Sequence, residues 1–181
     1  MNTLQIGPNA YVVTTSTFDP YYSEFSDCLI WGLEVVCEGG PLKVGATLSV
    51  DCAWATHSGE PSDWTAAIGR IQRWDTRAQS AEAPAFLYLC EHTPIEVGEL
   101  AIVAVDSRLE VRFSGTCDLS YEELTEETPV CATIQPASWG IRVSTADEAY
   151  ARRILGPFVD LGSFRLEQDE EGLRFVSGSY T

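Results

Sequence analysis

The residues that most often carry catalytic chemistry are scarce in this chain and form no known catalytic motif. Lys43 is the single lysine, and His57 and His92 are the two histidines. The sequence contains no Gly-x-x-x-x-Gly-Lys, Gly-x-Gly-x-x-Gly, Gly-x-Ser-x-Gly or His-Glu-x-x-His pattern. Such motifs supply nucleotide-binding loops, nucleophilic serines and catalytic zinc sites. Nucleotide hydrolysis and phosphoryl transfer are therefore disfavoured, and we assign no catalytic residue and no cofactor.

One loop nevertheless carries the three residue types of a hydrolytic triad. His57, Ser58 and Asp63 lie in a polar run from residue 55 to residue 64. A triad depends on groups that the fold brings together, so closeness along the chain does not establish one. His92 lies in a second predicted turn. A solvated loop position is the alternative interpretation for both histidines, and whether the chain is an enzyme stays open.

Six cysteines are expected to be reduced thiols rather than disulfides or metal ligands. Most of them lie in apolar stretches, where a thiol packs as a small hydrophobic side chain: Cys28, Cys37, Cys52, Cys90, Cys117 and Cys131. No Cys-x-x-Cys pair occurs and only His57 and His92 could complete a zinc site, so we expect no metal. The first residues lack the basic and apolar regions of a secretory signal, and no stretch approaches the roughly 20 apolar residues that span a membrane. A cytoplasmic location is the expectation.

The strongest signal is a charge imbalance. The chain carries 27 acidic and 11 basic side chains, a formal net charge of −16. Between Glu82 and Glu127, eleven carboxylates face only Arg108 and Arg112. Such a surface repels nucleic acid and anionic membranes and steers basic proteins into encounter. We therefore expect a basic protein partner, no nucleic acid and no membrane. Acidity that serves solubility alone is the alternative.

The candidate contacts for a basic partner are four carboxylates near the end of this acidic segment. They follow Tyr121 in a run too polar to be a core strand: Glu122, Glu123, Glu126 and Glu127. A toxin that acts on nucleic acid or phosphorylated substrates carries a basic cleft, and an inhibitor would present carboxylates to that cleft. In composition the chain is similar to small acidic immunity proteins. The leading hypothesis is a non-enzymatic binding protein, such as an immunity-type inhibitor of a toxin.

Tryptophans beside polar loops could supply the anchors of such an interface. Trp64 and Trp139 are the candidates, and Trp74 also adjoins a polar loop in the sequence. Trp31 and Trp54 fall on the apolar faces of predicted strands and are assigned to the core. Exposed tryptophans with carboxylates are also typical of carbohydrate platforms, so a β-sandwich carbohydrate-active enzyme or sugar-binding module is a second hypothesis. A structural subunit of a larger assembly is a third.

The elements that must position these residues are predicted to be antiparallel strands of one β-rich domain over residues 1–181. Apolar residues alternate with polar ones over residues 29–37, 46–54 and 109–113, a pattern typical of half-buried strands. Residues 86–90 and 100–105 are continuously apolar and are predicted to be central strands covered on both faces. A capping box at Thr145 and the stop at Gly156-Pro157 predict one short helix over residues 146–155. Residues 164–175 are predicted to form a hairpin.

A weak internal repeat suggests a duplicated hairpin. Leu33–Val50 aligns without gaps on Phe86–Val103, matching the cysteine, glutamate, proline and glycine positions of the two segments. Two related hairpins would fit an antiparallel two-sheet sandwich or a partly open barrel. Chance resemblance is the alternative, because proline and glycine are the residues that any such turn selects.

Overall fold

The computed structural model describes residues 2–40, 44–54, 68–78, 82–105, 108–136, 140–170 and 172–177. Thirteen strands dominate these ranges: β1 Thr3–Ile6, β2 Asn9–Ser23, β3 Cys28–Cys37, β4 Ala46–Trp54, β5 Ile71–Asp75, β6 Ala85–Tyr88, β7 His92–Pro94, β8 Val97–Val105, β9 Arg108–Cys117, β10 Thr128–Ile134, β11 Gly140–Val143, β12 Phe164–Asp169 and β13 Gly172–Ser177. The helical elements are α1 Glu148–Leu155 and the short 3₁₀ helices η2 Ser120–Glu122 and η3 Leu161–Ser163. The prediction of an all-β fold with one short helix is confirmed.

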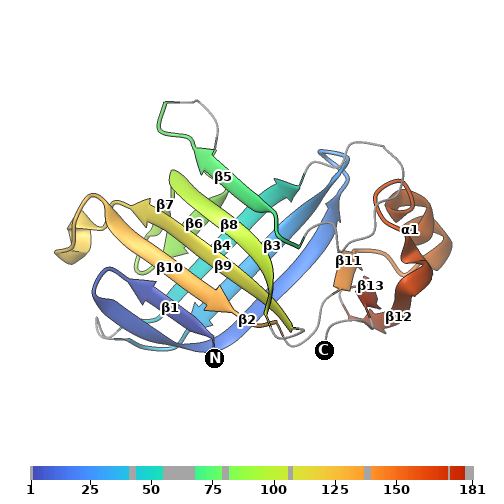
Figure 1. Ribbon diagram of the computed structural model, residues 1–181, viewed down its shortest axis with the longest axis horizontal. Coiled ribbons are helices and arrows are strands. Elements are labelled where there is room, and N and C mark those ends of the chain that lie inside the picture. Colours follow the sequence, from blue (N-terminus) through green and yellow to red (C-terminus); the bar gives the residue numbers. More distant parts are fainter. Residues whose placement is uncertain are drawn as a thin grey trace.

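The strands form one strongly curled sheet, a half-barrel (Figure 1). Its order is β5-β8-β9-β10-β1-β2-β3-β4-β6-β7, and β11, β13 and β12 extend from β2 as a branch. The described strands pair antiparallel except for β11 and β2, which meet through the parallel pair of Arg142 and Tyr21. Of the two predicted arrangements, the structure shows the partly open barrel. Within the described ranges, no helix is both long and apolar enough to cross a membrane.

The core lies on the concave side of the curled sheet, where the period-two pattern places one face of each strand. Leu33 and Val35 of β3 and Leu48 and Val50 of β4 are at most 1% exposed. Burial of each such side chain contributes about 1.5–3 kcal/mol to folding. The predicted strands over residues 29–37, 46–54 and 109–113 all occur. The prediction that residues 86–90 and 100–105 are covered on both faces was wrong, because Tyr88 is 46% exposed and Ala104 is exposed as well.

Helix α1 begins two residues later than predicted. The N-cap is Asp147, whose Oδ1 accepts a hydrogen bond from the backbone N–H of Tyr150 at 3.1 Å. Thr145, the predicted cap, instead accepts from the N–H of Asp147 at 3.1 Å. Aspartate is as good a cap as threonine, so two polar residues in tandem make the first helical residue ambiguous from sequence. The predicted C-terminal hairpin is present as β12 and β13.

The duplicated hairpin was not found. In the first copy β3 pairs with β4 over nine residue pairs, as a hairpin should. In the second copy β6 pairs with β4 and β7, whereas β8 pairs with β5 and β9. Pro94 lies in β7 opposite Phe86 rather than in a turn. The local sequences match, but strand partners depend on contacts made elsewhere in the chain.

Candidate functional site

The four predicted carboxylates lie in the loop between β9 and β10, at the left end of the half-barrel in Figure 1. This loop is held by hydrogen bonds within itself. Thr128, only 1% exposed, donates its hydroxyl to the carbonyl of Thr125 at 2.7 Å and accepts from the Thr125 N–H at 3.1 Å. Asp118 Oδ1 accepts from the N–H and hydroxyl of Ser120 at 2.9 and 2.7 Å. The loop therefore presents its charges from a fixed backbone.

Glu126 and Glu127 line a hollow of about 590 Å³, here called the acidic hollow. It is formed where β7, β8, β9 and this loop meet. Its lining residues are Arg77, Glu91, His92, Thr93, Pro94, Glu96, Val97, Thr116, Cys117, Asp118, Tyr121, Glu126 and Glu127. Among the residues that the structure describes, five carboxylates thus face one guanidinium, a net charge of −4 when His92 is neutral. The hollow concentrates a charge that the sequence spreads over many residues.

The arginine that lines the acidic hollow is already engaged. Arg77 makes a salt bridge with Asp75 at 2.7 Å and reaches Glu127 at 3.7 Å. The hydrogen bonds from Ser120 lower the pKa of the Asp118 carboxyl, which keeps that group ionised. An incoming ammonium about 4 Å from one carboxylate gains about 1 kcal/mol in water and more near protein. The arrangement is suited to binding a cation.

Two tyrosines border the hollow and were not among the predicted contacts. Tyr121 is 41% exposed, and its hydroxyl lies 2.9 Å from the hydroxyl of Thr93. The ring of Tyr88 lies 5.0 Å from the ring of His92. Exposed tyrosines fixed by such contacts are suited to anchoring a protein interface. Tyr121 directly precedes the predicted glutamates, but nothing in the sequence places Tyr88 beside them.

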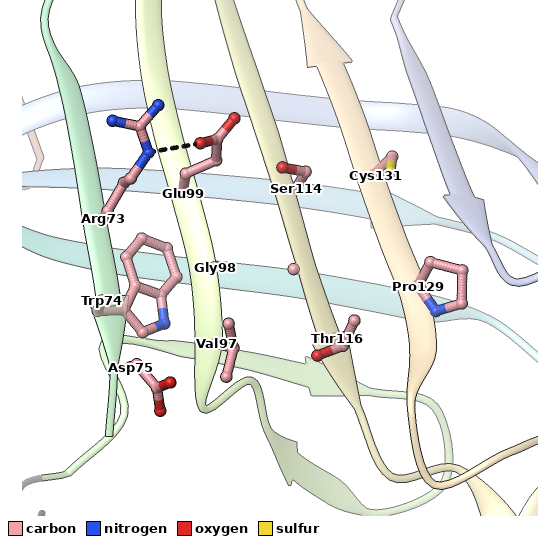
Figure 2. Close-up of a pocket in the computed structure, with 11 residues that line it drawn as sticks. Arg73, Trp74, Asp75, Val97, Gly98, Glu99, Ser114, Thr116, Pro129 and Cys131 are labelled. Carbon is pink, nitrogen blue, oxygen red and sulfur yellow. Dashed lines mark hydrogen bonds and ion pairs between the residues drawn. The ribbon is translucent and has the colours of Figure 1, made fainter. Parts of the chain in front are cut away.

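A second hollow adjoins the first on the outer face of β5, β8, β9 and β10 (Figure 2). We call it the glycine hollow. It measures about 620 Å³ and shares Val97 and Thr116 with the acidic hollow. Short outward side chains leave it open, and the salt bridge of Arg73 with Glu99, 3.0 Å long, closes one end. The remaining lining residues are Trp74, Asp75, Gly98, Ser114, Gly115, Pro129 and Cys131.

Trp74 supports the glycine hollow from the core side. Its indole N–H donates to the carbonyl of Ile95 at 2.9 Å, and its ring lies 6.1 Å from that of Phe113. A Cβ atom on Gly98 would approach the Trp74 ring to 2.6 Å, so glycine is required for the ring to lie against the strand. Trp74 is half-buried, and it serves here as a support rather than as an exposed anchor.

The structure brings together only part of the predicted set. Glu126 and Glu127 share the acidic hollow, whereas Glu122 hydrogen-bonds the thiol of Cys90 and raises its pKa. Glu123 takes a left-handed conformation, with φ of 60°, and does not line the hollow. The anchors Trp64 and Trp139, the histidine His57 and the side chain of Trp54 lie outside the described residues.

Trp31 is buried, 5% exposed, as predicted for a core residue. Among the described residues, no group of three or more histidines, cysteines or acidic residues has a geometry that could hold a metal ion. All six cysteines are free thiols, four of them buried. No protein-family model, curated protein or solved structure matches the chain.

Proposed function

We propose that this protein is a non-enzymatic binding protein that captures a basic protein partner through the acidic hollow, in the manner of an immunity-type inhibitor of a toxin. The observation that supports the proposal most is the charge of the hollow. Five carboxylates of the described part of the chain line it, and Arg77 is already bound by Asp75. A lysine or arginine side chain from a partner would supply the missing positive charge.

The surroundings of the acidic hollow also favour a protein as the ligand. Protein interfaces use tyrosine anchors inside a polar rim. Tyr88 and Tyr121 are exposed beside the carboxylates, and the glycine hollow offers a second depression that continues from Val97 and Thr116. A basic loop with one apolar side chain would fit both hollows. The free thiols agree with a reducing compartment, which supports the proposal of a cytoplasmic protein.

The test begins with affinity capture from the native host, followed by binding kinetics with the recovered partner at two salt concentrations. Counted over the described lining residues, Glu126→Lys with Glu127→Lys leaves three carboxylates against three cations in the hollow. Electrostatic steering raises association rates by about 10- to 1000-fold, so the double reversal should slow association at least tenfold at low salt. Glu82→Lys with Glu170→Lys is the matched control, because both residues are exposed and lie outside the hollow.

A second pair of variants separates anchoring from steering. Tyr121→Ala should mainly raise the dissociation rate, because a truncated anchor leaves the charges in place. Phe25→Ala is its control: the Phe25 ring is fully exposed, and it lies in the turn between β2 and β3. Association that does not depend on salt and is unchanged by the double reversal would refute the proposal and leave the acidity as surface solvation.

A further inference from the structure

A third hollow lies on the outer face of β2, β3 and β4, beside β11. It measures about 350 Å³ and shares no lining residue with the acidic hollow. An outer sheet face is ordinarily flat and open to solvent. Here β11 meets the end of β2 through the pair of Arg142 and Tyr21, so that the β11–β13 branch forms a wall beside the sheet (Figure 1). We call this hollow the branch pocket.

Strand register explains why the branch pocket has depth. Asp19, Gly32 and Asp51 are direct neighbours across β2, β3 and β4, in one row of the sheet. Gly32 therefore lies between two aspartates and has no side chain of its own. A Cβ atom at this position would come within 3.4 Å of the Asp19 carbonyl, Asp51 Oδ1 and the Tyr21 ring. The glycine forms the floor, and any larger side chain would fill the pocket.

The polar groups around this floor include both signs of charge. Asp19 is neutralised by a salt bridge to Arg174 in which both side chains are at most 20% exposed. Asp51 accepts a hydrogen bond from the Tyr21 hydroxyl, and burial raises the pKa of the Asp51 carboxyl. Glu34 lies in the next outward-facing row of β3, and Arg142 of β11 also lines the pocket. The lining thus offers carboxylate acceptors on one side and a cationic donor on the other.

Such a lining selects against charged ligands. An anion would be repelled by Glu34 and Asp51, and a cation would be repelled by Arg142. For either ligand this repulsion offsets part of the favourable electrostatic energy of binding. Hydroxyl groups both donate and accept, and they can satisfy carboxylate and guanidinium together. The ring faces of Tyr21 and Tyr22 add apolar surface, and the volume is in the range of small-molecule pockets, about 300–1,000 Å³.

We propose that the branch pocket binds an uncharged, hydroxyl-rich molecule of pyranose size, a sugar, between the carboxylates of Asp51 and Glu34 and the guanidinium of Arg142. This site is independent of the acidic hollow. Charge reversal by Glu126→Lys with Glu127→Lys in the acidic hollow should therefore leave sugar binding in the branch pocket unchanged. The failure of either proposal leaves the other standing.

The experiment is saturation-transfer NMR of the full chain with D-glucose, D-galactose, D-mannose and N-acetyl-D-glucosamine, with amide chemical shifts recorded in parallel. Glucosamine and glucose 6-phosphate are the cationic and anionic comparisons. At least one neutral sugar should receive saturation and shift the amides of residues 19, 32 and 51, and both charged sugars should bind more weakly.

Gly32→Leu should weaken that binding at least tenfold by filling the floor. Val36→Leu is the matched control, since Val36 lies on the same strand and outer face but outside the pocket. Asp51→Asn keeps the shape of the pocket, removes the carboxylate and should also weaken sugar binding. It provides the test where Gly32→Leu does not fold. Absence of saturation in all four neutral sugars, binding that survives Gly32→Leu, or tighter binding of a charged sugar would overturn the proposal.

Discussion

Gly98 and Trp74 allow a quantitative test of how the glycine hollow is built. A Cβ atom on Gly98 would lie 2.6 Å from Cζ2 of Trp74 and 3.0 Å from the carbonyl oxygen of Ser114. Overpacking of this kind costs about 1–3 kcal/mol. Gly98 is not among the glycines with positive φ, so alanine also gains about 0.4–1 kcal/mol by restricting the unfolded chain. The two ranges combine to a net loss of about 0–2.6 kcal/mol, so Gly98→Ala should lower the free energy of unfolding, by about 1.3 kcal/mol at the centre of that range.

A double-mutant cycle with Trp74→Leu identifies the clashing group. Trp74→Leu alone removes the 2.9 Å hydrogen bond to the Ile95 carbonyl, worth about 1 kcal/mol, and loses ring packing in addition. In that background Gly98→Ala should cost less than in the wild type, because the ring that it meets is gone. Contacting residues of this kind couple by about 0.5–3 kcal/mol. The contact with Ser114 remains and accounts for the residual cost.

The assay is urea unfolding followed by circular dichroism, since Trp74→Leu would change the fluorescence signal itself. Gly32→Ala is the matched control within a strand: its Cβ would meet no atom closer than 3.4 Å, so it should be nearly neutral. A Gly98→Ala variant more stable than wild type, or an equal cost in both backgrounds, would refute the placement of the Trp74 ring.

Three further measurements test the core, the thiols and the loop. Cys52→Ser should lower the unfolding free energy by about 1–3 kcal/mol, because Cys52 is 1% exposed and a hydroxyl there has no partner; no measurable change in urea unfolding would contradict its burial. Thiol titration should count six groups in denaturant without reductant, and in the native protein the exposed Cys90 and Cys131 should react before the four buried thiols; a count near zero would show disulfides. Ser120→Ala should raise the pKa of Asp118 toward its ordinary value, because that pKa is lowered mainly by the Ser120 hydroxyl. The interactions that lower the pKa of Asp118 stabilise the fold at pH values above the ordinary carboxyl pKa, and this stabilisation is lost as the pH falls through the lowered pKa. Wild type and Ser120→Ala should therefore converge in stability in acid. A carboxyl NMR titration in which the pKa of Asp118 is unchanged by Ser120→Ala would contradict this reasoning.

The parts of the fold that could be predicted are those determined by residues within about ten positions of one another along the chain. The alternation over residues 46–54 matches β4 from Ala46 to Trp54, and the turn between β12 and β13 follows from its polar residues. These signals depend on one strand face or one turn. The repeat failed because the two segments share a sequence pattern but not strand partners: β3 pairs with β4, whereas β6 pairs with β4 and β7, and β8 pairs with β5 and β9. Strand partners are chosen by contacts far along the chain.

The lining of the acidic hollow could likewise be predicted only in part from the sequence. Glu126 and Glu127 could be found as part of a charged run, but Glu91, Glu96 and Asp118 reach them only through the pairing of β8 with β9. The same pairing sets Val97 opposite Thr116 and Glu99 opposite Ser114, and these outward side chains line the second hollow. Net charge is visible in a sequence, whereas its concentration at one point of a surface requires the register of the sheet.

The bracing of the β9–β10 loop bears on how such a site would act under the proposed function. Binding normally loses free energy when loops become ordered, by about 0.5–1.5 kcal/mol for each immobilised side chain. Thr128 and Asp118 already hold this loop through hydrogen bonds of 2.7–3.1 Å, so much of that ordering is completed during folding. Arg77 remains as an internal cation, 3.7 Å from Glu127, where a partner's guanidinium would lie. A partner's cation that displaced Arg77 from Glu127 would replace a weak, exposed contact, and Arg77 would keep its salt bridge with Asp75, so Arg77 competes only weakly for Glu127.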